Sequence, residues 1–320
     1  MTQISVAMTT CNGERYVGEQ LRSIVTQSRL PDEVVVCDDR SVDQTLRIVE
    51  AVLADVPFRV EVIVNSERVG VVANVEQAIR RTTGDLVILA DHDDVWRPNK
   101  LSRLVDRFET EPEVGAVFSN AMIIDQNSRA TGKELWSSAG FSAARRSQWR
   151  TDPVGVLMRG NVVTGAALAF RASLKTLVLP IPRQGWHDLW IACLIAATSR
   201  VDALDEVLLD YRVHSGNAAG LPRSIRAELD RRLDQPAERY DNLAQIEALA
   251  TRLEEQGFGA DPVVRRLRAK MQHLEIRFDL PARVPARAGA VLRAAIAGRY
   301  QRYSAGNSSA LFDLIYGGRR

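Results

Sequence analysis

Apolar and polar positions follow two rhythms along the first 220 residues. Apolar or alternating runs, which are typical of strands, occur at residues 4–10, 33–37, 59–65, 86–90, 114–119, 161–170 and 201–212. Apolar positions three and four apart predict helices over 14–26, 42–54, 72–81, a stretch that begins at Pro98, and 189–198. Ser41 is expected to cap the second helix. Strand and helix alternate, which predicts an α/β fold with a mostly parallel sheet covered by helices on both faces.

The rhythm changes after Asp125. Residues 126–152 are polar and rich in Ser, Ala and Arg, and they are interpreted as a variable excursion from the sheet. From Ser224 onward the apolar spacing is helical. These changes predict a core domain over residues 1–220 and a helical C-terminal extension over residues 221–320.

The carboxyl ends of three predicted strands carry polar side chains. Asp91, Asp93 and Asp94 follow the apolar run 86–90, and residues i and i+2 of an extended segment point the same way. Two carboxylates facing one point suit Mg²⁺ or Mn²⁺ when phosphate oxygens complete the coordination. A solvated acidic turn is the alternative for such a motif alone. Further polar residues follow the first two strands, at Thr9-Thr10 and Asp38-Asp39, and ligands of α/β sheets bind at this edge.

Several segments together resemble the family-two inverting nucleotide-sugar glycosyltransferases, which have the GT-A fold. They are TTCNGERYVGEQLRSIVTQ, VVVCDDRSVDQT, GDLVILADHDDVWRPNK, TGAALAF, WHDLW and YRVHSGN, in this order over about 215 residues. The ADHDDVW form, followed by WHDLW and YRVHSGN, is similar to the bacterial rhamnosyltransferase-like branch. Two positions depart from the pattern. Arg40 stands where the family has glycine, and His92 stands where the branch has glutamine.

The resemblance implies a role for each matching residue. The nucleotide sugar is expected to contact Thr9, Thr10, Glu14, Asp38, Asp39, Asp91, Trp96 and Lys100. The metal ion, Mg²⁺ or Mn²⁺, is expected on Asp93 and His214, with the middle residue His92 pointing away from it. Asp188 is expected to be the general base, and Gly165, Trp186 and His187 to lie on the acceptor side.

Each of these residues also has a purely structural interpretation. Asp188 is placed where an acid stabilises a helix N-terminus, and His214 fits an ordinary loop histidine. Trp96 and Trp186 are either core residues or walls for a sugar ring. Arg212 either binds phosphate or lies along the surface.

The implied reaction agrees with the residue types. A divalent ion neutralises the leaving diphosphate, and one carboxylate takes the proton of the acceptor hydroxyl. Attack from the opposite face inverts the anomeric carbon without a covalent intermediate. The donor expected from the branch is dTDP-L-rhamnose, with a UDP- or GDP-sugar as the alternative. The acceptor is expected to be a bacterial surface polysaccharide or lipid-linked glycan. A nucleotidyltransferase and a non-catalytic sugar-binding module rank lower, the first because CNGERYV lacks a glycine-rich phosphate loop.

Charge and composition limit the remaining classes. The net charge of +2 argues against a nucleic-acid binder, and three widely spaced cysteines argue against a disulfide or zinc framework. No signal peptide is recognisable, so a cytoplasmic enzyme is expected. Residues after Leu280 contain seven Arg and one Asp, interleaved with apolar residues. Such a basic amphipathic segment suits peripheral contact with the cytoplasmic face of a membrane, or else packs as a solvated helix on its own domain. A homodimer is left open.

Overall fold

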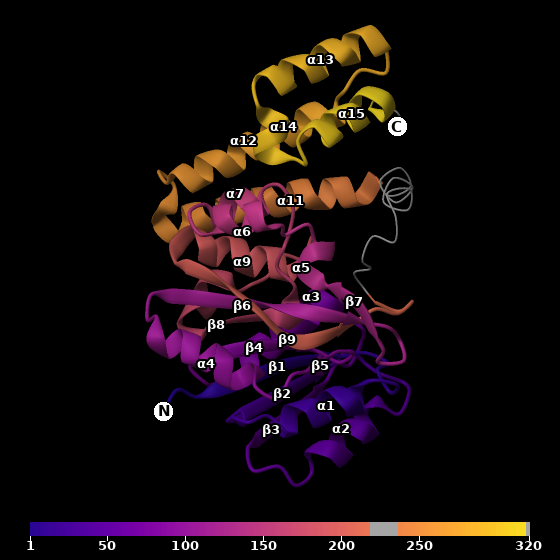
Figure 1. Cartoon of the computed structure of the whole chain (residues 1–320), viewed down its shortest axis with the longest axis vertical. Coiled ribbons are helices and arrows are strands. Elements are labelled where there is room, and N and C mark those ends of the chain that lie inside the picture. Colours follow the sequence, from indigo (N-terminus) through magenta and orange to yellow (C-terminus); the bar gives the residue numbers. More distant parts are fainter. Residues whose placement is uncertain (218–235, 318–320) are drawn as a thin grey trace.

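The computed structural model describes residues 1–217 and 236–317. A nine-stranded sheet forms its centre, and helices cover both faces (Figure 1). The strand order is β3-β2-β1-β4-β8-β6-β9-β5, with β7 paired to β6. The strands are β1 Ile4–Thr10, β2 Glu33–Asp38, β3 Arg59–Val64, β4 Leu86–Asp91, β5 Val95–Trp96, β6 Val114–Ile124, β7 Ala130–Glu134, β8 Leu168–Arg171 and β9 Arg200–Arg212.

The half of the sheet formed by β1 to β4 is parallel, as the apolar runs predict. β1 and β2 are buried along their whole length because helices cover both faces. Beyond β4 the sheet is mixed, since β8 is antiparallel to both β4 and β6, and β6 and β9 are parallel again. The predicted α/β architecture with a mixed sheet is therefore confirmed.

Two layers of helices bury the faces of the sheet. The helices are α1 Val17–Val25, α2 Thr45–Leu53, α3 Val71–Arg81, α4 Lys100–Thr110, α5 Leu135–Ser138, α6 Ala143–Trp149, α7 Pro153–Leu157, α8 Lys175–Val178 and α9 His187–Thr198. The apolar stripes of α1, α2 and α4 pack into one core, represented by Leu21, Val49 and Leu104. Helices α3 and α9 pack into the other, represented by Ile79 and Ile191. The apolar residues whose spacing predicts these helices are thus the residues that each helix buries.

Two stretches differ from their sequence-based interpretation. Residues 126–152 contain β7, α5 and α6, and they supply Trp136, Phe141 and Trp149 to the core around Phe118. The excursion is therefore part of the folded core, because a few large aromatic side chains anchor a segment that is otherwise polar. The strand predicted over 161–170 is shorter, since residues Gly165–Ala167 form a 3₁₀ turn and only Leu168–Arg171 pairs in the sheet.

The C-terminal extension is helical in its described part, as predicted. Its helices are α11 Pro236–Leu253, a π turn Glu254–Phe258, α12 Pro262–Phe278, α13 Val284–Ile296, α14 Arg299–Tyr303 and α15 Asn307–Tyr316. Leu249 of α11 and Leu267 of α12 belong to the same core as α9, whereas α13 to α15 enclose a small core of their own around Tyr300. Figure 1 shows α13 at the end of the molecule farthest from the parallel half of the sheet. The predicted boundary between residues 220 and 221 lies outside the described residues.

The described residues contain free cysteines, as expected from the wide spacing of the three in the sequence. Cys11, Cys37 and Cys193 are free thiols, and burial raises the pKa of Cys37 and of Cys193 to about 12. In the described part of the chain, none of the helices has the length and apolar character needed to cross a bilayer.

The aromatic cluster of the excursion yields a stability prediction. Trp149 is buried, its ring centroid lies 5.0 Å from that of Phe118, and its indole N–H donates to the carbonyl of Val201 at 2.8 Å. We expect Trp149→Ala to lower the free energy of unfolding by about 3–5 kcal/mol, measured by urea denaturation, because it leaves a cavity and an unpaired carbonyl. Trp186→Ala, at a tryptophan that is 38% exposed, is the matched control and should be clearly milder. Equal effects would contradict a core role for the excursion.

Candidate active site

Strands β1, β2 and β4 end in register at one edge of the sheet. Thr10 lies opposite Asp38 on β2, and Thr9 lies opposite Asp91 on β4. The register brings together three polar strand ends that are far apart in sequence. The edge predicted from the strand pattern therefore exists in the structure.

Asp38 is held by hydrogen bonds from its own chain. The carboxylate is fully buried and accepts from the Thr10 hydroxyl at 2.7 Å. It also accepts from the backbone N–H of Ser41 at 2.7 Å and from the Ser41 hydroxyl at 2.6 Å. Ser41 therefore does not cap the following helix, which begins at Thr45, and that expectation was wrong. Contact of Asp38 with a nucleotide stays a prediction.

Asp39 organises the loop that follows β3. Its carboxylate accepts from the backbone N–H groups of Val69 and Gly70 at 2.7 and 3.0 Å, and from the Asn65 amide at 3.1 Å. The next residue, Arg40, has φ +55°, in the left-handed region that glycine adopts more readily. The turn therefore keeps the backbone form that suits glycine, although the residue is arginine.

The loop after β1 is tied to the loop after β2. Gly13 donates its N–H to the Thr45 hydroxyl at 2.7 Å, and Glu14 donates its N–H to Asp43 at 3.1 Å. The Glu14 carboxylate accepts the N–H of Gln44 at 3.0 Å. Glu14 thus fixes the two loops relative to each other, and its contact with a nucleotide stays a prediction.

Three carboxylates gather where β4 ends. Oxygen atoms of Asp91, Asp93 and Asp94 all lie within 4.8 Å of one another. His92, between them, packs its ring against the loop after β1, since a Cβ added to Gly13 would lie 2.3 Å from its Cδ2 atom. The sequence pairs Asp91 with Asp93, and the structure adds Asp94 as a third carboxylate.

Burial and mutual repulsion make this group electrostatically unfavourable by itself. Burial and the charge of Asp93 raise the pKa of Asp91. The pKa of Asp94 is raised well above its usual range by burial, with the charges of Asp93 and Asp91 adding to the effect. One oxygen of Asp94, Oδ2, is buried and has no hydrogen-bond partner among the described residues. Three crowded carboxylates and an unpartnered oxygen fit a divalent cation, which would replace the missing interactions.

His214 lies against Asp93, but as a hydrogen-bond donor. Its Nε2 atom is 2.9 Å from Oδ2 of Asp93, and its Nδ1 atom accepts the N–H of Gly216 at 3.0 Å. A neutral ring that accepts at Nδ1 carries its proton on Nε2. Asn217 donates to the same oxygen of Asp93 at 3.1 Å. His214 could therefore ligate a cation through Nε2 only after giving up the bond from Gly216, and its assignment as a ligand stays a prediction.

Arg212 is fully buried, so the interpretation that it lies along the surface was wrong, while its contact with a phosphate stays a prediction. Its backbone N–H donates to Oδ1 of Asp94 at 2.9 Å, and its Nε donates to the carbonyl of Asp93 at 2.7 Å. The rest of the guanidinium donates to the Ser128 hydroxyl at 2.8 Å and to the Glu19 carboxylate at 2.7 Å. With these donors engaged inside the protein, Arg212 holds the acidic turn in position.

Trp96 and Lys100 lie beneath the acidic turn, inside the protein. Trp96 belongs to the apolar core, which favours the structural interpretation of this residue over a wall for a sugar ring. Lys100 is fully buried, with its Nζ atom 4.1 Å from the centroid of the Trp96 ring and 2.7 Å from the carbonyl of Ala166, to which it donates. Burial lowers the pKa of Lys100 to about 7 although Asp94 and Asp91 oppose the change. Lys100 therefore places a positive charge in the protein interior, where it interacts with the carboxylates of Asp94 and Asp91.

Asp188 lies in the first turn of α9. One carboxylate oxygen accepts from the Asn161 amide at 2.9 Å and from the N–H of Leu189 at 2.7 Å. Burial raises the pKa of Asp188, while His187 and the hydrogen bonds act in the opposite direction. A carboxylate with raised pKa is a better proton acceptor than a solvated one.

The other predicted acceptor-side residues surround Asp188. His187 is buried with its Nδ1 atom unpartnered among the described residues, and a Cβ added to Gly165 would lie 2.5 Å from its Nε2 atom. Gly165 is thus required for the position of that ring. The indole of Trp186 is part exposed, and its backbone carbonyl accepts the Gln245 amide of α11 at 2.6 Å. Gly165, Trp186 and His187 therefore lie close to one another, next to Asp188.

Tyr211 on β9 shows that the two groups of acids share one region. Burial raises the pKa of its hydroxyl above the ordinary range, and the charges of Asp94, Asp91, Asp93 and Asp188 all add to the effect. Asp188 likewise raises the pKa of Asp91. The carboxylates from β4 and from α9 thus act on the same side chains.

Sequence reasoning missed three residues of this site. Tyr16 packs its ring between His214 and Arg212, with distances of 4.9 Å between ring centroids and 4.6 Å to the guanidinium carbon. Asn217 donates to Asp93, and the charges of the acids raise the pKa of Tyr211. The aromatic residues resembled core positions in the apolar pattern, so only their spatial neighbours reveal them.

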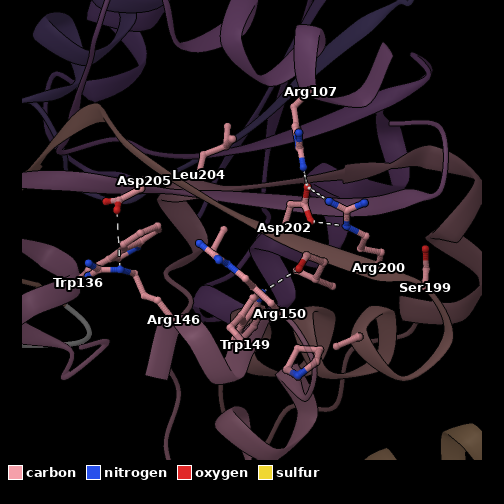
Figure 2. Close-up of a pocket in the computed structure, with 14 residues that line it drawn as sticks. Arg107, Trp136, Arg146, Trp149, Arg150, Ser199, Arg200, Asp202, Leu204 and Asp205 are labelled. Atoms are coloured by element: carbon pink, nitrogen blue, oxygen red, sulfur yellow. Dashed lines mark hydrogen bonds and ion pairs between the residues drawn. The ribbon is translucent and has the colours of Figure 1, made fainter. Parts of the chain in front are cut away.

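A separate pocket of about 630 Å³ lies at the opposite end of β9 (Figure 2). It is lined by residues 200–205 and by Arg146 and Trp149 of α6. From Asp205 to Arg212 an extended strand covers roughly 20 Å, so this pocket is distinct from the acidic site. Figure 2 shows that Asp202 is paired with Arg107 and Arg200, and Asp205 with Arg146. These charges largely satisfy each other.

Comparison with known proteins assigns the chain to a family. Residues 5–164 match the family described as Glycosyl transferase family 2. "Putative glycosyltransferase EpsE" of Bacillus subtilis is 31% identical over 258 residues, which cover 76% of this chain and 87% of EpsE. An uncharacterized glycosyltransferase of Nostoc sp. is 28% identical over 67% of this chain and 66% of its own length. The dTDP-rhamnosyl transferase RfbG of Shigella flexneri is 28% identical over 124 residues, 38% of this chain and 40% of RfbG.

The chain therefore belongs to glycosyltransferase family 2. Solved structures support the fold. TarS 1–349 of S. aureus with UDP-GlcNAc has a TM-score of 0.60 at 17% identity, over 92% of this chain and 81% of that one. The mannosyltransferase PcManGT of Pyrobaculum calidifontis, solved with GDP-Man and Mn²⁺, has a TM-score of 0.56 at 20% identity, over 97% and 80%. The expected GT-A fold is confirmed.

Lys100 yields a prediction for the pH dependence of stability. Its pKa is about 7 in the folded protein and near 10.5, the ordinary value for lysine, when unfolded, so the unfolded chain binds more protons between these values. The free energy of unfolding should therefore rise with pH through this window, with Lys100 contributing about 1.4 kcal/mol per pH unit at most. Lys100→Met should remove that contribution in urea titrations at pH 7 to 10 without metal. Lys133→Met, on exposed β7, should keep the wild-type slope, and an unchanged slope in Lys100→Met would contradict the assignment.

Proposed function

We propose that this chain is a metal-dependent inverting glycosyltransferase that moves a sugar from a nucleotide diphosphate to a hydroxyl of a glycan. The main support is one arrangement of acids. Asp91, Asp93 and Asp94 crowd at the end of β4 with one buried oxygen unpartnered, and Asp188 acts on the same region from α9. A cation site beside a separate carboxylate is what this reaction needs.

The residues proposed to hold the cation are Asp93 and Asp94, with Asp91 on the donor side and His214 as an additional ligand after rearrangement. A bound Mg²⁺ or Mn²⁺ would neutralise the leaving diphosphate. The chain itself contributes the orientation of these ligands. Arg212 fixes Asp93 and Asp94, and His214 with Asn217 fixes the outer oxygen of Asp93.

Asp188 is proposed to take the proton from the acceptor hydroxyl. Its raised pKa suits a general base, because a desolvated carboxylate accepts a proton more readily at neutral pH. Asn161 and the N–H of Leu189 orient one oxygen, and the backbone of Gly165 also hydrogen-bonds to the carboxylate. Trp186, part exposed at the start of α9, is proposed to contact the acceptor sugar. Deprotonation on one face of the donor sugar, with the diphosphate on the other, inverts the anomeric carbon.

The proposed donor is dTDP-L-rhamnose, and the proposed acceptor is a bacterial surface polysaccharide or lipid-linked glycan. The similarity to RfbG, named a dTDP-rhamnosyl transferase, supports this donor. The structural neighbours were solved with UDP-GlcNAc and with GDP-Man, so a UDP- or GDP-sugar is the equal alternative.

Donor binding can be tested by thermal shift with dTDP-, UDP- and GDP-sugars, each with and without Mn²⁺ or Mg²⁺. We expect one nucleotide class to raise the unfolding temperature, and the rise to require the metal ion. Asp93→Asn should abolish the metal-dependent part, because it removes charge from the cation site. Asp106→Asn, on the exposed side of α4, should behave as wild type. A full metal-dependent shift in Asp93→Asn would refute the proposed cation site.

The base can be tested by single-turnover kinetics with Asp188→Asn. Donor binding should persist, while the rate of transfer should fall by about 10²–10⁴-fold, the usual contribution of a general base. Asp106→Asn again serves as the control. If Asp188→Asn retained transfer within about tenfold of wild type, this carboxylate would not be the base.

A further inference from the structure

The outermost helix of the C-terminal extension exposes large aliphatic side chains. On α13, Leu292 is 60% exposed and Ile296 is 79% exposed. They are four residues apart, so they lie on the same side of the helix, one turn from each other. On α15, which packs against α13, Leu311 and Ile315 repeat this spacing and are also exposed. Leu292 and Ile296 of α13, together with Leu311 and Ile315 of α15, are called the apolar face below.

The fold of this region does not use the apolar face. The small core is formed by other residues of the same helices, which are Leu280, Val291, Ala294 and Tyr300. Arg287 secures the end of the chain by donating to the carbonyls of Leu314 and Gly317 at 2.9 and 2.7 Å. The helices thus have their own packing, and the exposed aliphatic residues are an addition to it.

Among the described residues, several arginines of the terminal helices have no acidic partner. Arg283, Arg293, Arg299 and Arg302 form no ion pair with any residue of the described ranges. The single acid between Leu280 and Gly317 is Asp313. It is buried and engaged by Arg277 at 2.6 Å and by the Tyr300 hydroxyl at 2.8 Å, so it does not neutralise the surface.

We propose that the apolar face of α13 and α15 docks on the surface of an anionic lipid bilayer. Aliphatic side chains on a helix that also carries arginines insert at the boundary between headgroups and acyl chains, while the guanidinium groups meet anionic headgroups. Protein interfaces are instead centred on aromatic anchors, whereas the four residues of the apolar face are all aliphatic. The observations therefore favour a bilayer over a protein partner.

Docking at a bilayer extends the proposed function to acceptors held in a membrane. Only this benefit for a lipid-linked acceptor rests on the proposed function. A chain held at the surface by α13 would meet acceptors confined to the membrane at a high local concentration. The docking itself is independent of which nucleotide sugar is used.

Sedimentation of the full chain with vesicles tests the inference. Vesicles of phosphatidylglycerol and phosphatidylethanolamine should carry the protein down, and vesicles of phosphatidylcholine should carry much less. The double variant Leu292→Glu with Ile296→Glu should bind the anionic vesicles about tenfold more weakly or worse, because it removes aliphatic insertion and adds repulsion. The matched control is Val62→Glu with Val64→Glu on β3, which are also exposed and change the net charge equally.

Two results would contradict docking through the apolar face. Failure of the wild type to sediment with anionic vesicles, or equal binding by both double variants, would overturn the proposal. Thermal unfolding of both variants should match the wild type, since all four side chains are exposed. Nucleotide-sugar binding, measured on the same variants, tests the proposed function separately. Loss of vesicle binding can therefore be distinguished from loss of nucleotide-sugar binding.

Discussion

The acidic site depends on one buried guanidinium. Arg212, at the end of β9, binds the turn after β4 through its backbone and its side chain, and it reaches α1 through Glu19. A buried arginine is stable only when its donors are satisfied, so the turn, the helix and the strand must all be in place together. Because these three segments lie far apart in sequence, the acidic turn takes its shape only in the complete fold.

This constraint explains how acids can be crowded at one point of a folded protein. Three carboxylates near one another repel, and burial adds a desolvation cost. Lys100 offsets part of that cost, because its ammonium group is buried against Trp96 and attracts the carboxylates. The unpartnered oxygen of Asp94 shows that the compensation is incomplete. A site that is left under-neutralised by its own side chains is suited to a cation arriving with a diphosphate.

The sequence was sufficient for the regular part of the fold and for the acids themselves. Continuous apolar runs predicted β1, β2 and β4 to within a residue or two, and strand ends in parallel sheets meet by geometry, which placed Thr9, Asp38 and Asp91 together. The roles of Lys100 and Arg212 could not be predicted, because a basic residue in a pattern gives no sign of being buried. The packing of the excursion 126–152 was missed for the opposite reason, since two tryptophans and Phe141 outweigh many polar residues once they are packed.

The same packing relates the helix that carries Asp188 to the far end of the molecule. Helix α9, which carries Asp188, shares its core with α11 and α12, and the backbone of Trp186 is bound by Gln245 of α11. Helix α12 in turn holds the terminal helices, through Arg277 with Asp313 and through His273 with Ser304. The orientation of α13 relative to Asp188 is therefore set by successive buried contacts, not by a free linker. A surface bound through α13 would consequently have a fixed orientation relative to Asp188.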